Sequence, residues 1–300
     1  MNENLLSLPV AEQLSPSVSL RRIGELPLVV VDHPGVRAAV TLQGAQVVGW
    51  QPTGAEPGLW LSERTEWIAG RAVRGGVPLC WPWFGPAGSP SHGFARITTW
   101  ELDAHEESAE GVRLVLTLRD TEETRALWPH AFTLVARISL GETCDIELEA
   151  HGDHETTAAL HTYLRIGDID AVGLTDLGER YTDNLLDAQG TAEKELRPVG
   201  RVERVYTEPV DRSLVHDEGL GRMIEVRHRH QSDVVVWNPG PELSHTMADL
   251  TDDGYRRFVC VETARLARPL VSTPGNPARL AVTLRALKDP AGSAGSERPV

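Results

Sequence analysis

Apolar and polar residues alternate along several stretches of the chain, with the period of two that places apolar side chains on one face of a strand. In 132–140 every second residue is apolar, and after a Gly-Glu turn the pattern resumes in 144–150. These two stretches predict an antiparallel hairpin with one face in the core and the other in solvent. Stretches 112–118 and 280–286 show the same alternation and predict two more strands.

Helical signals are few. The best candidate is 121–127, which Asp120 or Thr121 could cap and which Trp128-Pro129 would end. Many short strands, bounded by 27 glycines and 20 prolines, predict an all-β fold: a large antiparallel β-sandwich with few short helices.

The body of the chain contains no internal repeat and no Pro/Ser-rich linker, so we expect a single β-sandwich domain over 26–289. Residues 1–25 are expected to form an N-terminal arm, whose role the sequence does not indicate. Residues 290–300 lack apolar anchors and are predicted to be a disordered tail.

Net charge restricts the partners of the protein. The 29 basic and 43 acidic residues give −14, which argues against nucleic acid or an anionic membrane surface as the main partner. A small anionic ligand remains compatible, because two arginines can outweigh a distant acidic surface. No apolar run approaches the ~20 residues of a membrane span, and the N-terminus lacks the basic start of a signal peptide. We expect a soluble, cytoplasmic protein; its oligomeric state is not indicated.

Neither a metal nor a cofactor is expected. The chain lacks the short motifs that mark nucleotide-binding, zinc-protease and serine-hydrolase sites. The three distant cysteines, Cys80, Cys144 and Cys260, are predicted to be buried, reduced thiols rather than disulfides or zinc ligands. Four histidines lie on strand-like or polar stretches and are interpreted as surface residues: His151, His154, His228 and His230.

The segment 71–100 combines aromatic side chains with Arg74, His92 and Arg96. Its prolines and glycines exclude a regular helix or central strand. Rigid aromatic walls with a few polar groups suit a sugar, and the planar guanidinium group suits phosphate or carboxylate. The alternative is an aromatic core beneath a long loop with solvated arginines.

Two further stretches carry polar groups on predicted strands. In 157–166 one face is apolar, and the other carries His161 and Tyr163. In 258–263 Glu262 shares a face with Cys260 and is flanked by valines. Burial would raise the pKa of the Glu262 carboxyl group and make it a base near neutral pH, unless it forms a structural salt bridge.

Together these motifs resemble the aldose 1-epimerase (galactose mutarotase-like) superfamily, in its hexose-6-phosphate mutarotase branch. The resemblance runs from about residue 29 to 287 and rests on RGGVPLCWPWFGP, HGFAR, LHTYLRIGDI, RVY, VWNPGP and DDGYRRFVCVET. It implies the supersandwich fold of that superfamily, with a sugar cleft on a concave sheet face. It also implies that Glu262 removes the proton of the anomeric C1 hydroxyl while His161 protonates the ring oxygen.

The resemblance further implies that Arg74 and Arg96 bind a 6-phosphate and that His92 bonds to sugar oxygens. Two positions depart from the family pattern: Ser91 stands where some relatives have Gln, and Glu203 stands where Asp is common. Both are retained as expected substrate-binding residues.

The leading hypothesis is an isomerase that interconverts the α and β anomers of D-glucose 6-phosphate and related aldohexose 6-phosphates. Ring opening needs one proton removed and one delivered, and each positioned acid or base supplies ~10²–10⁴-fold. Two alternatives stay open: a mutarotase of unphosphorylated aldoses and a noncatalytic sugar-binding β-sandwich. The preferred hexose and the pathway are not indicated.

Overall fold

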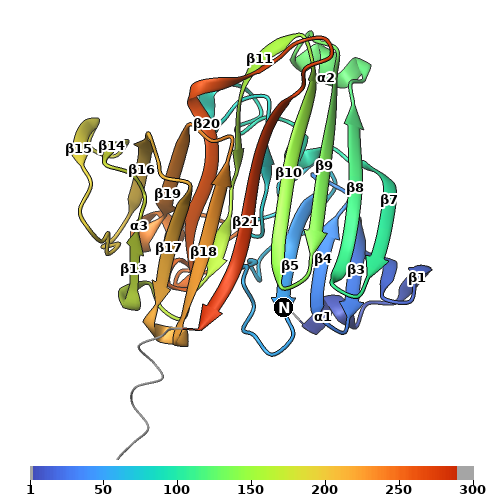
Figure 1. Cartoon of the computed structure of the whole chain (residues 1–300), viewed down its shortest axis with the longest axis horizontal. Coiled ribbons are helices and arrows are strands. Elements are labelled where there is room, and N and C mark those ends of the chain that lie inside the picture. Colours follow the sequence, from blue (N-terminus) through green and yellow to red (C-terminus); the bar gives the residue numbers. More distant parts are fainter. Residues whose placement is uncertain (1–2, 289–300) are drawn as a thin grey trace, which may run out of the picture.

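The computed structural model describes residues 3–288 and consists of three antiparallel sheets with a few short helices (Figure 1). The predicted all-β sandwich is confirmed. The tail predicted at 290–300 lies outside the described residues.

The first sheet is a five-stranded meander in which each strand pairs with the next. Its strands are β1 (Val10–Ser15), β2 (Val18–Ile23), β3 (Leu26–His33), β4 (Val36–Thr41) and β5 (Gln46–Pro52). Helix α1 (Glu3–Leu6) buries Leu5 beside this sheet, and Val18 of β2 is also buried. Over its described residues, the segment expected as an arm therefore contributes two strands of the sheet.

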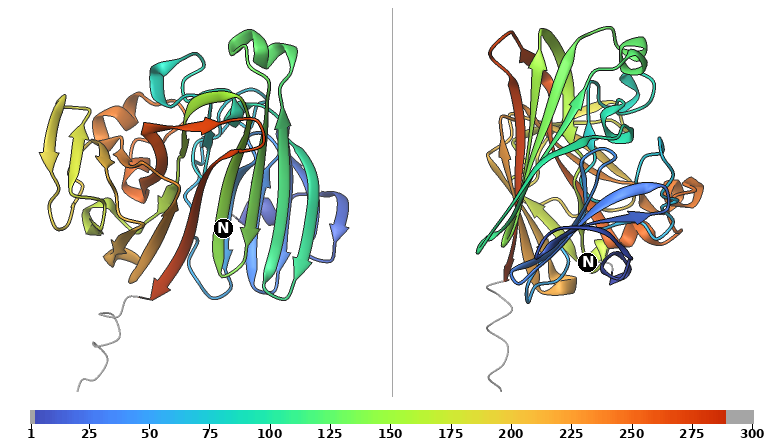
Figure 2. Two further views of the ribbon diagram at one scale, coloured as in Figure 1. Left: turned by 45° about the horizontal axis from the view of Figure 1, so that its top comes forward. Right: turned by 90° about the vertical axis from the view of Figure 1, so that its right-hand side faces the viewer.

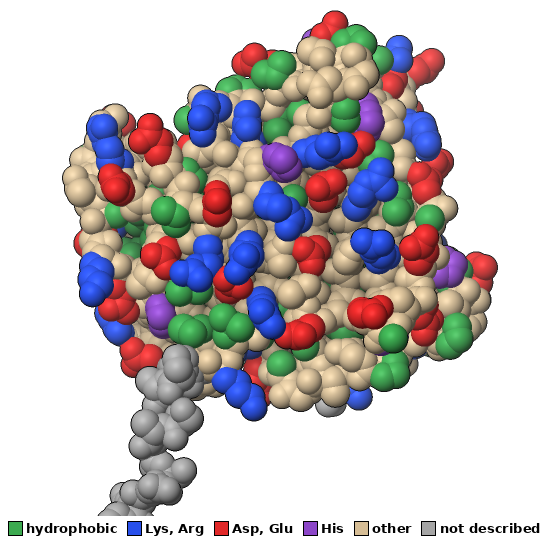
Figure 3. Space-filling view, in the orientation of Figure 1, with side chains coloured by type: hydrophobic (Ala, Val, Ile, Leu, Met, Phe, Trp, Pro, Cys, Tyr) green, Lys and Arg blue, Asp and Glu red, His purple; other side chains and the backbone are tan. Residues whose placement is uncertain are grey.

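The second sheet has eight strands and contains all four strands predicted from alternation. In spatial order they are β13 (Val172–Thr175), β17 (Arg212–Asp217), β18 (Arg222–Arg229), β21 (Ala278–Lys288), β10 (Thr143–Gly152), β9 (Phe132–Leu140), β8 (Gly111–Arg119) and β7 (Glu101–Ser108). Along β9 burial alternates residue by residue. Figure 3 looks onto the outer side of this sheet, where acidic and basic side chains are interspersed. The structure therefore confirms the prediction that one face of the β9–β10 hairpin lies in solvent.

The third sheet carries the candidate site. Its path is β15 (Ala188–Thr191), β14 (Arg180–Asp183), β16 (Val202–Thr207), β19 (Asp233–Asn238), β20 (Phe258–Ser272), β11 (His154–Leu160) and β6 (Leu79–Cys80). The short strand β12 (Tyr163–Arg165) also pairs with β20. Residues 157–166 are thus divided between two strands and do not form the single strand that we predicted.

One hydrophobic core joins the three sheets. The second sheet is a broad layer backed by the third sheet at one end and by the first sheet at the other (Figure 1; Figure 2, right). Trp50 of the first sheet, Leu148 of the second and Val261 of the third belong to the same buried cluster. Because Val259 and Val261 fill this core, the alternate residues of β20 must point to the opposite face.

Helix α2 (Glu122–Leu127) confirms the best helix candidate of the sequence. The Thr121 hydroxyl accepts from the Thr124 amide, and the Thr124 hydroxyl accepts from the Thr121 amide, which is a capping box. The remaining helices are α3 (Gly240–Thr246) and the 3₁₀ turns Gly85–Ala87, Ala95–Ile97, Ile169–Ala171, Glu218–Leu220 and Gly254–Arg257. Between residues 3 and 288, no helix has the length and apolar character needed to cross a membrane.

The surface assignment was wrong for two of the four histidines. His154 is buried, and so is His228, whose Nδ1 lies 2.7 Å from Thr263 Oγ1 and whose Nε2 lies 3.1 Å from Ser213 Oγ. Two hydroxyl partners satisfy the ring without a charge, and burial lowers the pKa of His228 to about 4. All three cysteines are buried free thiols, as predicted.

Candidate active site

The register of the third sheet brings His161 and Glu262 face to face. Leu160 pairs with Thr263 at the end of β11, and Tyr163 pairs with Cys260 at the start of β12. The same register continues across the break, so His161 lies directly opposite Glu262 on the neighbouring antiparallel strand. Cross-strand neighbours have Cβ atoms ~5 Å apart, close enough for both side chains to act on one small molecule.

The backbone between β11 and β12 is held on both of its edges. The Val261 amide of β20 donates to the Thr162 carbonyl, while the His161 amide donates to the Pro78 carbonyl and the Tyr163 amide to the Gly76 carbonyl. Gly76 adopts φ +63°, and a Cβ there would lie 2.2 Å from the Val47 carbonyl oxygen. Gly76, the second glycine of the RGG motif, is therefore required for this close backbone approach.

His161 and Glu262 form a buried and incompletely satisfied pair. The exposed fractions of the two residues are 6% and 1%, and His161 Nδ1 lies 3.4 Å from Glu262 Oε1. Neither His161 Nδ1 nor Glu262 Oε2 has a hydrogen-bond partner among the described residues. Buried polar atoms are normally paired, so these two atoms mark a place for a polar ligand.

Burial shifts the pKa values of the pair toward their neutral forms. It lowers the pKa of His161 well below 6.5, and the charges of His92, Arg74 and Arg96 lower it further. It raises the pKa of Glu262 well above 4.5, and Glu203 raises it further. Burial therefore favours the neutral imidazole and the neutral carboxyl group over the ion pair. Strongly shifted groups facing each other are typical of catalytic sites.

The ring of Tyr163 fixes the plane of the His161 ring. The two rings stack with centroids 4.7 Å apart and an angle of 5° between planes. The Tyr163 hydroxyl accepts a hydrogen bond of 2.9 Å from Arg74 Nη1, and Arg74 Nε donates at 3.0 Å to Asp249 Oδ2. Arg74 is thus engaged in orienting the aromatic neighbour of His161. No pattern in the sequence predicted the pairing of Arg74 with Asp249, because the two residues lie far apart in the chain.

Arg96 is the less engaged of the two predicted phosphate-binding arginines. One terminal nitrogen, Nη2, donates to the Ser91 carbonyl at 2.8 Å, while its buried Nε has no partner within residues 3–288. The Ser91 hydroxyl donates to the Gly85 carbonyl at 3.1 Å. Ser91 therefore contacts Arg96 through its backbone and stabilises the loop with its side chain.

His92 lies beside His161 and feels the charges of both arginines. Its ring centroid is 5.5 Å from that of His161 and 4.8 Å from that of Phe84. Burial and the charges of Arg96 and Arg74 lower its pKa to about 3. His92 is consequently neutral at physiological pH and can donate or accept a hydrogen bond.

The aromatic side chains of the segment are divided between the core and the candidate site. Trp81, Phe94 and Trp100 are buried in the shared core, as the alternative reading predicted. Phe84 instead contacts the site, with its ring centroid 6.5 Å from that of His161. Trp237, which we did not single out, lies 6.1 Å from the His161 ring. The alternation of residues 234–238 could have predicted this position, because it places Trp237 on the same sheet face as Glu262.

Glu203 reaches the site from strand β16. The register pairs Glu203 with Trp237, and Trp237 with Cys260, so all three occupy one row of the same sheet face. Its carboxylate raises the pKa of Glu262 and accepts a hydrogen bond of 2.9 Å from Arg201. The sequence predicted the residue but not its proximity to Glu262.

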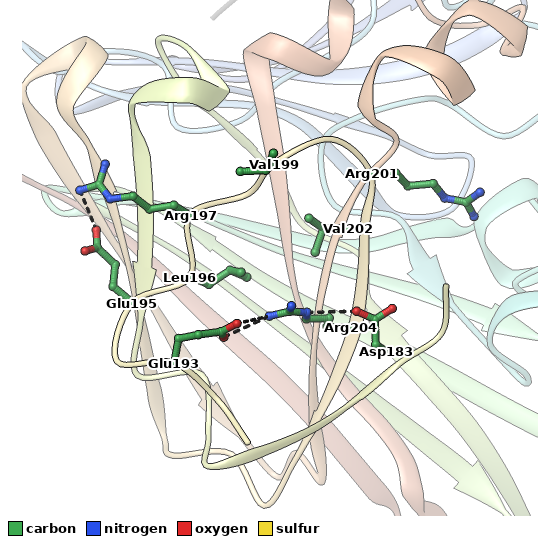
Figure 4. Close-up of a pocket in the computed structure, with 9 residues that line it drawn as sticks. All are labelled: Asp183, Glu193, Glu195, Leu196, Arg197, Val199, Arg201, Val202 and Arg204. Atoms are coloured by element: carbon green, nitrogen blue, oxygen red, sulfur yellow. Dashed lines mark hydrogen bonds and ion pairs between the residues drawn. The ribbon is translucent and has the colours of Figure 1, made fainter. Parts of the chain in front are cut away.

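One compact cluster of possible metal ligands occurs within residues 3–288, and it overlaps this pair: His161, Cys260 and Glu262. Elsewhere, a cavity of about 340 Å³ lies at the edge of the third sheet beside β14 and β16 (Figure 4). Its arginines are already paired, Arg204 with Glu193 and Asp183, and Arg197 with Glu195. That cavity therefore offers a poorer site for an anion than Arg96.

Comparison with known proteins identifies the family. The model of the family described as Aldose 1-epimerase matches residues 27–285. The chain belongs to the aldose 1-epimerase family. A protein of Escherichia coli K12 named "Putative glucose-6-phosphate 1-epimerase" is 50% identical over 294 residues, which cover 96% of this chain and 100% of that protein.

Solved structures agree with this membership of the aldose 1-epimerase family. The crystal structure of "a putative mutarotase (YeaD)" from Salmonella typhimurium superposes with a TM-score of 0.94 at 49% identity, covering 95% of this chain and 99% of that one. A galactose mutarotase related enzyme from Lactobacillus acidophilus shares the fold alone, with a TM-score of 0.67 at 12% identity over 87% of this chain and 97% of that one.

Proposed function

We propose that this member of the aldose 1-epimerase family interconverts the α and β anomers of D-glucose 6-phosphate and related aldohexose 6-phosphates. The observation that carries the proposal is the buried, opposed His161/Glu262 pair with an unpartnered atom on each side chain. The names of the relatives that are 50% identical over nearly the whole chain support the phosphorylated substrate. The three buried free thiols fit a reducing compartment such as the cytoplasm.

In the proposed mechanism the pair carries one proton in total. Ring opening starts with that proton on His161: Glu262 takes the proton of the C1 hydroxyl, and the imidazolium protonates the ring oxygen as the C1–O5 bond breaks. Rotation about C1–C2 then presents the other face of the aldehyde. Ring closure starts with the proton on Glu262, which is the form that burial favours, and it restores the first state. The proton count is unchanged, so the enzyme accelerates equilibration without shifting it.

The decisive test follows anomer exchange by NMR with glucose 6-phosphate at equilibrium. With the protein present, the C1 proton signals of the two anomers should show exchange between α and β at a rate far above that in buffer alone. Exchange at the rate of buffer, with folded protein at saturating sugar phosphate, would contradict the proposed function.

The pH profile of kcat/KM should show a plateau between an acid limb and an alkaline limb. The active pair holds one proton, so activity falls only when a second proton binds or the last is lost. Because burial lowers the pKa of His161, the acid limb of kcat/KM should lie below pH 6.5; because it raises the pKa of Glu262, the alkaline limb should lie well above pH 4.5. Free glucose serves as the control, since it lacks a titrating phosphate. An acid limb above pH 6.5 with both sugars would contradict the proposed proton inventory.

Arg96 should distinguish phosphorylated from free sugar. Because Arg74 is held by Asp249 and Tyr163, we propose that Arg96 makes the main phosphate contact, and Arg96→Ala should raise KM for glucose 6-phosphate about 10–100-fold. KM for free glucose should change much less. Arg119→Ala is the control, because it alters an arginine of the second sheet paired with Glu101, and both KM values should stay unchanged. Equal KM effects on both sugars would favour the mutarotase of unphosphorylated aldoses.

A further inference from the structure

Three potential metal ligands meet on the site face of the third sheet. Cys260 and Glu262 alternate on β20, so their side chains are neighbours on one face, and His161 lies opposite Glu262. One ligand atom from each, a nitrogen, a sulfur and an oxygen, lie within 4.8 Å of one another, and all three residues are buried. The proposed proton transfer uses the nitrogen and the oxygen but leaves the sulfur of Cys260 without a role.

The unpartnered atoms of this triad point to a ligand that can satisfy them. His161 Nδ1 and Glu262 Oε2 lack hydrogen-bond partners in the described part of the chain although both residues are more than nine-tenths buried. A neutral sugar hydroxyl can satisfy such atoms, and so can a cation. The thiol beside them adds the soft donor that a sugar does not need but that a thiophilic metal ion prefers.

The donor set matches Zn²⁺ in ligand type and in charge. Zinc binds Cys, His and carboxylate ligands at ~2.0–2.3 Å in tetrahedral sites, which places ligand atoms roughly 3.6 Å apart. The triad therefore needs side-chain shifts of about 1 Å to close on the ion, and the fourth position stays open for water. One thiolate and one carboxylate balance the two positive charges, and binding releases the protons they carried.

We propose that His161, Cys260 and Glu262 form a binding site for Zn²⁺ or another thiophilic divalent cation, and that its occupation blocks anomer exchange. The bound ion removes His161 and Glu262 from proton transfer and fills the place of the sugar. The inhibition rests on the proposed function; the metal site does not.

Calorimetric titration tests the site without any activity. Zn²⁺ is titrated into the full chain in a non-chelating buffer with a phosphine reductant, because dithiol reductants bind zinc themselves. Wild-type protein should bind one ion, and Cys260→Ala should weaken its affinity at least about 10–100-fold. Cys144→Ala is the matched control, since Cys144 is an equally buried thiol on β10 of the second sheet, and its affinity should equal that of wild type.

A second readout keeps the test valid if Cys260→Ala does not fold. Co²⁺ added to wild-type protein should produce a thiolate-to-metal charge-transfer band, and Cys260→Ser, checked for folding by circular dichroism, should lack it. Equal Zn²⁺ affinity in wild type and Cys260→Ala would overturn the proposal. So would a loss of binding in Cys80→Ala alone, because Cys80 is the other buried thiol on this sheet.

Anomer exchange then separates the metal site from the proposed function. Free Zn²⁺ should stop exchange by wild type, a chelator should restore it, and Mg²⁺ should have no effect because it avoids thiolates. Cys260→Ala should retain its own zinc-free rate at the same Zn²⁺ concentration. If wild type is active and its rate does not change with Zn²⁺, the proposed inhibition is wrong. If wild type is inactive but still binds one ion through Cys260, the metal site is supported and the epimerase function is contradicted.

Discussion

Replacing Glu262 by Gln is expected to lower kcat for anomer exchange by about 10²–10⁴-fold, because the amide cannot accept the proton of the C1 hydroxyl. The same substitution should raise the melting temperature at neutral pH. The folded-state pKa of Glu262 lies above its unfolded value, so ionisation costs stability as pH rises above 4.5, and Gln removes that cost. NMR exchange and a thermal melt measure the two effects.

Glu149→Gln is the matched control for this prediction. Glu149 is also buried, on β10, but hydrogen bonds from Arg279 and His151 outweigh its burial and hold its pKa below the usual value. The control should therefore keep its activity and lose stability. Exchange at the wild-type rate in folded Glu262→Gln protein would remove the proposed base. It would also favour the noncatalytic sugar-binding alternative if His161→Asn behaved in the same way.

Replacing His161 by Asn should lower kcat by a similar factor of about 10²–10⁴, because no group then protonates the ring oxygen. The double variant with Glu262→Gln should lose far less than the product of the two single losses, since the side chains act as one unit. Stability should become less sensitive to acid: the folded-state pKa of His161 is lowered, so wild type loses stability as pH falls below 6.5.

His33→Asn provides the control for His161→Asn. His33 is a buried histidine on β3 of the first sheet, bonded to the Ser108 carbonyl and the Gly35 amide. Its substitution should affect the melting temperature but not the rate of exchange. Additive losses in the double variant would show instead that His161 and Glu262 act in separate steps.

Cys260 belongs to the proposed metal site but has no role in the proposed proton transfer. The proposed proton transfer uses only His161 and Glu262, whereas the proposed zinc site uses the adjacent thiol as well. Substitution of Cys260 therefore separates the two properties, which no substitution of His161 or Glu262 can do.

Local alternation in the sequence determined the strands and their faces. It predicted β8, β9, β10 and β21, the buried valines of β20, and the shared face of Cys260 and Glu262. These features depend on the period of the side chains along one strand, and that period is visible in any short stretch. The helix cap was predictable as Asp120 or Thr121 for the same reason, because capping involves residues only three apart, and the structure shows Thr121 in that place.

The tertiary structure alone decided which strands are neighbours and in which register. A one-residue slip of register would move His161 to the other face or away from Glu262, and nothing local in the sequence fixes the pairing of β11 and β12 with β20. The contact of Arg74 with Asp249, the approach of Glu203 to Glu262 and the burial of His228 between two sheets arise in the same way. Each depends on residues far apart in the chain that meet only when the apolar faces of the sheets pack together.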